Sequence, residues 1–269
     1  MRAYLTRPST FNSDTDLYIL GDLEQLDEPH YLSLQARREV GISRYFSKTL
    51  SAEAGISYRF SDVDDDFGAR QFSHLALPLT LTWDRRDDQL NPANGTYLHA
   101  EVMPFLGLGN SVSGGRGYLD ARAYHGFGAD DGVVFAGRLQ FGSIVGSSIA
   151  ATPPDLLFFS GGSGSVRGHS YQSLSLISGP TDTGGRSFLG FAGEARVSIS
   201  EKIAAVAFYD VGYIGANSWI DSTGGWHSGA GFGLRYQTGI GPIRLDVAAP
   251  VTGASTSSFQ FYIGIGQAF

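Results

Sequence analysis

A glycine-rich stretch with a single arginine is the most informative part of this chain. It spans residues 158–174 and reads FFSGGSGSVRGHSYQSL. Its glycines allow sharp turns and close approach to other backbone, and Arg167 carries a planar fork of donors that matches a carboxylate. Two carboxylates, Glu194 and Asp210, follow in the next two alternating segments. From the stretch alone, an inward-folded functional loop and an ordinary surface loop both remain open.

The dominant pattern along the chain has a period of two. It is clearest in residues 259–269, where Phe259, Phe261, Ile263, Ile265 and Phe269 share one face. Similar segments cover 15–25, 29–41, 48–62, 70–84, 95–107, 116–127, 133–144, 187–200, 202–214, 224–237, 240–250 and 256–269, with a partial one at 1–8. They exceed the roughly 5–6 residues of ordinary soluble strands and match tilted strands that cross a bilayer. The sequence therefore predicts an all-β fold, a transmembrane antiparallel β-barrel of about twelve full strands plus a partial one.

The chemistry of the two faces also favours a membrane barrel. One face of each segment is apolar, and the other is mostly polar, charged or glycine, as in residues 187–199, where Glu194 and Arg196 oppose Phe191 and Val197. A soluble sandwich also alternates, so the period alone leaves it open. The length of the strands, the aromatic residues near their ends and the glycine-rich polar face favour a barrel with a wet interior.

Composition narrows the class further. The 269 residues include 37 Gly, 18 Phe and 13 Tyr, and no Cys, which excludes disulfides and thiolate metal sites. No run approaches the ~18–20 apolar residues of a membrane helix. A net charge of −7 argues against nucleic-acid binding through a broadly basic surface.

Long and short connections alternate along the chain. Long ones fall near 62–70, 107–116, 144–187, 214–224 and 249–257. Barrels of this kind have short periplasmic turns and longer external loops, so the pattern places the arginine stretch outside and Phe269 at the periplasmic end. The connection at 144–187 is too long for a simple hairpin and is predicted to be functional.

Several short motifs follow one another in a fixed order. They are DRRDDQLNPANG at 84–95, SVRG at 165–168 with YQSL at 171–174, GE at 193–194, FYDVG at 208–212, GLR at 233–235, PIRLD at 242–246 and the final Phe269. Together they resemble the bacterial surface-antigen barrel of outer-membrane assembly factors, most closely the TamA-like translocation and assembly module subunits. The resemblance covers the whole chain.

The resemblance implies a role for the arginine stretch. Val166, Arg167, Gly168 and Tyr171 form a lumen loop motif, and Arg167 pairs with the inward carboxylates Glu194 and Asp210. The alternative is that both carboxylates merely solvate a water-filled lumen. His169 stands where the family usually has an aromatic residue. Either Tyr171 takes over the packing role, or His169 forms hydrogen bonds within the lumen.

The resemblance also implies a lateral gate in the last strand, carried by Gly264, Gly266 and Phe269. Glycines weaken side-chain packing there, although they could equally relieve crowding inside the barrel. Residues 1–269 are expected to form the barrel domain without its first strands, about three of the family's sixteen, and without the periplasmic repeat domains. The chain is then either a fragment or a smaller barrel closed by pairing 15–25 with the last strand.

The implied function is an outer-membrane factor that assists the insertion or secretion of other outer-membrane proteins, such as autotransporters. Its expected partners are the lipid bilayer of the bacterial outer membrane, unfolded clients and a periplasm-spanning inner-membrane protein. A two-partner-secretion-type transporter or a passive channel is the alternative. No enzyme, cofactor or metal is expected, because the six histidines show no triad or metal-site spacing. The acidic run at 62–66 could hold a cation loosely, or simply be solvated.

Overall fold

The computed structural model describes residues 1–178, 181–253 and 259–269. The main strands are β1 (Arg2–Arg7), β2 (Thr15–Glu28), β3 (Tyr31–Tyr45), β4 (Leu50–Asp65), β5 (Gly68–Ala76), β6 (Leu79–Asp84), β7 (Gly95–Gly107), β8 (Gly114–Phe127), β9 (Val133–Val145), β12 (Ser187–Ser198), β13 (Ile203–Gly215), β14 (Gly225–Tyr236), β15 (Ile243–Thr252) and β16 (Gln260–Ile265). A small hairpin of β10 (Leu176–Ser178) and β11 (Thr181–Thr183) and two 3-10 helices, Ala129–Asp131 and Pro154–Leu156, complete the elements.

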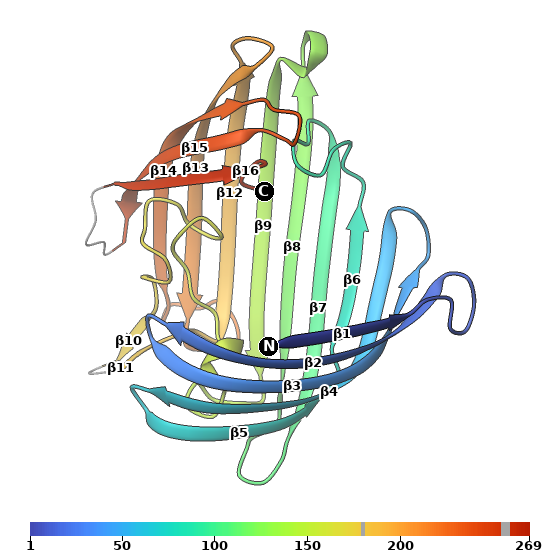
Figure 1. Ribbon diagram of the computed structural model, residues 1–269. Helices are drawn as coiled ribbons and strands as arrows, with labels where there is room; N and C mark the ends of the chain where they lie inside the picture. Colours follow the sequence, from blue (N-terminus) through green and yellow to red (C-terminus); the bar gives the residue numbers. More distant parts are fainter. Residues whose placement is uncertain (179–180, 254–258) are drawn as a thin grey trace.

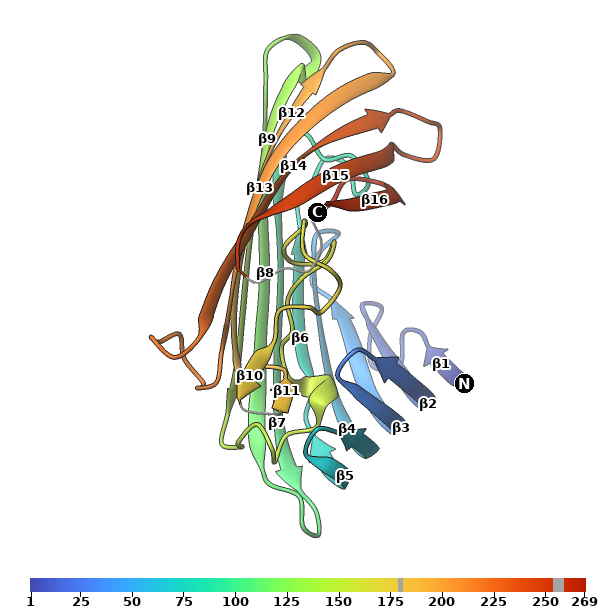
Figure 2. The same ribbon diagram turned by 90° about the vertical axis from the view of Figure 1, so that its left-hand side faces the viewer.

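The main strands form one 14-stranded antiparallel sheet that follows the order of the chain, with β6 paired to both β4 and β7. Figures 1 and 2 show that this sheet is strongly curved. Strands β7 to β9 form its middle, and β1–β5 and β12–β16 bend toward the same side. The segment between β9 and β12 lies on the concave side. Within the described residues, no helix is both long and apolar enough to span a bilayer.

The fold class predicted from the alternation is confirmed. In β14, Phe232, Leu234 and Tyr236 are exposed on the convex side, whereas Gly233 and Arg235 are buried on the concave side. A strand alternates its side chains between the two faces of a sheet, so one face becomes apolar and the other polar. The apolar face is the one that a bilayer covers in a membrane barrel.

Several strand boundaries differ from the prediction. The single strand expected over 70–84 is split into β5 and β6 around Pro78, which has no N–H to give to a ladder. The long connection expected near 62–70 is also wrong, because β4 extends to Asp65 and β5 begins at Gly68. The last strand was expected over 256–269 but ends at Ile265. Its start at 256–258 lies outside the described residues.

The first and last strands of the sheet, β1 and β16, each pair with a single neighbouring strand. β1 pairs with β2, and β16 pairs with β15, each over six residue pairs. No pairing joins β1 or β2 to β16 among the described residues. The structure therefore does not show the small closed barrel in which residues 15–25 would pair with the last strand, since β2 is already flanked by β1 and β3.

Candidate functional site: the inner loop

The connection between β9 and β12 folds into the concave side of the sheet. We call its described residues, 146–178 and 181–186, the inner loop. Its first part packs an apolar cluster onto β9, β12 and β13; the buried members are Ile144, Leu157, Phe158, Phe188 and Ile214. Arg59 of β4 pairs with Asp155 at 2.9 Å, and Arg116 of β8 donates to the Leu156 carbonyl at 3.1 Å. The first part of the inner loop is thus held both to β4 and β8 by polar contacts and to β9, β12 and β13 by apolar packing.

Glycines let the inner loop turn and approach the sheet. Gly161, Gly162 and Gly168 have φ values of 104°, 90° and 95°, a region that residues with a Cβ seldom adopt. Gly229 of β14 allows contact from the other side, because a Cβ there would lie 1.8 Å from the carbonyl oxygen of Arg167. The arginine is therefore placed by backbone contact as well as by its side chain.

Arg167 lies almost completely buried, with 2% of its surface exposed. Its Nε and Nη2 donate to the two oxygens of Asp210 at 2.7 and 2.8 Å, and its backbone N–H donates to the same carboxylate at 3.0 Å. Its Nη1 donates to Glu194 Oε1 at 2.5 Å. The guanidinium also lies 3.5 Å from the centre of the Phe208 ring. A bidentate pairing of this kind fixes the orientation of the guanidinium as well as compensating its charge. Breaking it would leave buried charge unpaired.

The pair belongs to a larger buried network of alternating charge. Its members are Arg167, Arg196, Arg235 and Arg244 with Glu194, Asp210 and Asp246. Arg196 Nε donates to Glu194 at 2.9 Å, and Arg235 donates to Asp246. Arg167 Nη1 lies 3.7 Å from Asp246 Oδ2, which links the two halves of the network. Glu194 and Asp246 each contact more than one guanidinium, whereas Asp210 pairs with Arg167 alone. The buried charges of both signs therefore compensate one another away from bulk water.

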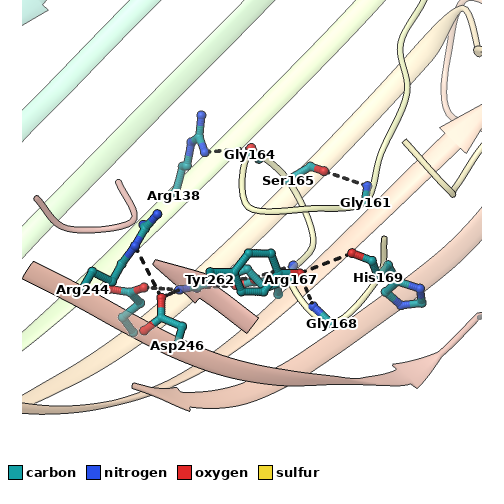
Figure 3. A network of polar contacts seen from close by, with 12 residues as sticks. Arg138, Gly161, Gly164, Ser165, Arg167, Gly168, His169, Arg244, Asp246 and Tyr262 are labelled. Atoms are coloured by element: carbon teal, nitrogen blue, oxygen red, sulfur yellow. Dashed lines mark hydrogen bonds and ion pairs between the residues drawn. The ribbon is translucent and has the colours of Figure 1, made fainter. Parts of the chain in front are cut away.

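The residues beside Arg167 reach the last strands (Figure 3). The Gly168 N–H donates to the Tyr262 hydroxyl of β16 at 3.0 Å, and that hydroxyl donates to the His169 carbonyl at 3.3 Å. His169 is fully buried, and its Nε2 lies 3.0 Å from the Ser228 carbonyl of β14. Tyr171 is 61% exposed and lies apart from the charge network. Of the two roles open for the missing aromatic, the structure therefore shows the hydrogen-bonded His169.

The three residues expected to form a gate do not share one strand. Gly264 lies in β16, whereas Gly266 follows the strand with φ 86°. The chain turns inward there, and Phe269 is buried against Tyr124 of β8 and Ala136 of β9. Phe269 therefore does not lie on the outward face with Phe261 and Ile263, as the alternation predicted. The positive φ of Gly266 is what breaks the alternation.

Sequence reasoning did not identify several partners in the site. Arg196, Arg235 and Asp246 complete the charge network, and Tyr262 contacts the inner loop. The period of two places all four on the inward face of their strands. That alternation is the feature of the sequence from which they could have been identified. The acidic run at 62–66 is partly used in local contacts, because Asp65 pairs with Arg70 and Asp66 accepts the backbone N–H of Asp182.

An apolar convex face, a polar concave face and a loop bonded inside together define an outer-membrane β-barrel protein with an inward-folded loop. The Omp85 superfamily domain matches residues 5–269, and the chain belongs to that superfamily. It is a family of bacterial outer-membrane barrels that act in protein assembly or transport.

Solved structures that share the fold include BamA and two CdiB proteins. BamA from Haemophilus ducreyi lacking POTRA domains 1–3 superposes with a TM-score of 0.76 at 15% identity, over 97% of this chain and 60% of that one. CdiB from Escherichia coli gives 0.63 at 13%, over 97% and 51%, and CdiB from Acinetobacter baumannii gives 0.54 at 14%, over 99% and 56%. The chain thus spans between half and three fifths of the length of these structures. At these identities the likeness concerns the fold.

Proposed function

We propose that this chain is the barrel part of a TamA-like assembly factor, which assists the insertion or secretion of other outer-membrane proteins such as autotransporters. The observation that carries the proposal is the way the inner loop supports five consecutive strands. Within residues 167–169 and their contacts, it reaches Glu194 of β12, Asp210 of β13, the Ser228 carbonyl of β14, Asp246 of β15 and Tyr262 of β16. A rigid support behind the last strand is what a templating edge requires.

The edge of β16 is the surface that this proposal assigns to clients. One edge of β16 pairs with β15, and the other has no strand partner among the described residues. An exposed edge presents a row of backbone donors and acceptors, which can bind an incoming strand with little demand on its sequence. Unfolded outer-membrane proteins are therefore the proposed clients. A periplasm-spanning inner-membrane protein is the proposed partner that delivers them, supported by the sequence motifs.

A two-partner-secretion-type transporter is the second candidate, and the fold shared with CdiB favours it. A transporter or passive channel conducts through its interior, so the inner loop would have to leave the concave side. That movement would break the buried contacts of Arg167 with Glu194 and Asp210. The present position of the inner loop therefore supports assembly at an edge over passage through the lumen.

Reconstitution of the full-length protein into phospholipid vesicles tests the proposal. We expect it to accelerate the folding of a urea-denatured autotransporter barrel, followed as a heat-modifiable band on a gel. Arg167→Ala should insert normally but lower that rate roughly tenfold, because it leaves the buried Asp210 without its guanidinium partner and weakens loop docking by on the order of 3–5 kcal/mol.

Lys48→Ala, in the exposed turn before β4, is the matched control and should retain the full rate. Vesicle conductance is measured in parallel. High conductance without faster client folding would favour the transporter. Equal client folding by Arg167→Ala at equal barrel abundance would show that the loop contact is not needed for assembly.

A further inference from the structure

The convex face of β3 carries a cation inside its apolar band. Arg38 lies at the middle of the strand and is exposed on the same face as Leu34 and Ala36 on one side and Val40 and Ile42 on the other. It makes no hydrogen bond or ion pair with any residue that the structure describes. A guanidinium facing lipid is unfavourable unless it reaches the interface or gains an anionic partner, and such residues are therefore functional candidates.

An apolar groove lies beside this cation. It has a volume of about 580 Å³ and is lined by Arg38 together with Leu5, Ile19, Val40, Ile56 and Tyr58. Gly21 of β2 lies directly across from Arg38 in the strand register, and a Cβ added there would meet nothing within 4 Å. The missing side chain thus leaves room next to the guanidinium. Tyr58 of β4 lies across from Arg38 on the other side.

The position of Arg38 along the strand determines how far the groove lies from the polar boundary of the apolar band. Asp62 of β4 is exposed and lies across from Leu34, so the polar boundary of this face begins two same-face positions away from Arg38. Four residues separate Leu34 from Arg38, or roughly 13 Å along a strand and about 9 Å of depth at the usual tilt. An arginine can extend its apolar stem along such a surface while its charged end approaches the headgroups.

We propose that Arg38 and this groove form a binding site for an anionic phospholipid. The guanidinium would hold the phosphate in a charge-assisted pair, and the acyl chains would lie against the groove residues. Charge decides the occupant, because an apolar groove next to an unpaired cation suits a lipid that combines acyl chains with a negative headgroup. The site is on the convex side and separate from the Arg167 network.

Native mass spectrometry of the full-length protein tests the site. The protein is released from detergent that contains equal amounts of phosphatidylglycerol and phosphatidylcholine. We expect retained phosphatidylglycerol to exceed phosphatidylcholine, and Arg38→Leu to reduce that preference roughly tenfold, the effect of losing one charge-assisted contact. Arg44→Leu is the matched control, because Arg44 lies on the same face of β3 but at its end, beside Phe46. It should keep the preference.

A second variant protects the test against misfolding. Gly21→Leu leaves Arg38 in place but fills the groove, so it should also lower the retained phosphatidylglycerol. The proposal is overturned if Arg38→Leu and Gly21→Leu both retain the lipid as the parent does, or if Arg44→Leu loses as much as Arg38→Leu. A parallel measurement uses detergent that contains equal amounts of phosphatidylglycerol and lipid A. Preferential retention of lipid A that depends on Arg38 would also overturn the proposal, since the bound lipid would then not be a phospholipid.

Discussion

At Gly229 the inner loop comes so close to β14 that a side chain has no room between them. A Cβ would lie 1.8 Å from the Arg167 carbonyl oxygen, a contact that requires movement of one backbone or the other. We expect Gly229→Ala to lower the free energy of unfolding by about 1–3 kcal/mol, the usual cost of overpacking, and to expose the inner loop to protease. The urea midpoint and the rate of cleavage within the loop measure both effects.

Gly225 provides the control on the same strand, because a Cβ there meets nothing within 4 Å. Gly225→Ala should therefore leave both the midpoint and the cleavage rate close to the parent values. If the two alanine variants behave alike, the close approach at Gly229 does not position the loop.

The sequence predicted which face of the sheet a side chain lies on. It did not predict which residues that side chain contacts. The period of two placed Glu194 and Asp210 on the inward face, and the resemblance named Arg167 as their partner, which is where the structure puts it. Asp246 and Tyr262 have the same parity, but their contacts with the loop depend on strand register and on the path of the loop. Neither is encoded in local alternation.

The inner loop acts at the scale of an element, because it is attached to both halves of the sheet. Its attachment to the first half includes Asp155, which is paired with Arg59 at 2.9 Å and mostly buried. We expect Asp155→Ala to destabilise the protein by roughly 1–3 kcal/mol, since it leaves Arg59 without its carboxylate. Hydrogen exchange should rise at residues 155–157 and stay low at 166–169, which Asp210 and Glu194 hold independently. An equal rise in both segments would mean that the loop moves as one unit.

Whole strands were predictable from the sequence, but their ends were not. Alternation identified every main strand position, because the faces of a membrane barrel differ strongly in polarity. It failed at 70–84, where Pro78 interrupts the ladder although the side chains continue to alternate. It also failed at 62–70, because polar residues favour a loop there, whereas β4 continues through Asp64 and Asp65. Strand hydrogen bonding can persist beyond the apolar band.

At the scale of the whole molecule, the sequence predicted a curved, barrel-like sheet but left open whether its two edges pair with each other. Alternation is local, whereas closure depends on strand number, tilt and shear acting together. Local alternation also does not predict that the segment Gly266–Phe269 turns into the interior. This segment joins the last strand to β8 and β9, which are distant along the sheet.

That turn gives a prediction about how the molecule holds its last strand. The N–H groups of Gly266 and Gln267 donate to the carbonyls of Pro242 and Leu90 at 2.7 and 2.9 Å, while the Phe269 ring fills the cluster with Tyr124. We expect Phe269→Ala to remove up to about 3–5 kcal/mol of packing and to raise hydrogen exchange at both amides. Phe261→Ala is the control, because Phe261 is 73% exposed on the convex face and makes no part of that cluster. If exchange at the two amides is unchanged in Phe269→Ala, the strand ladder alone holds the segment, and the interior contact contributes little to the position of β16.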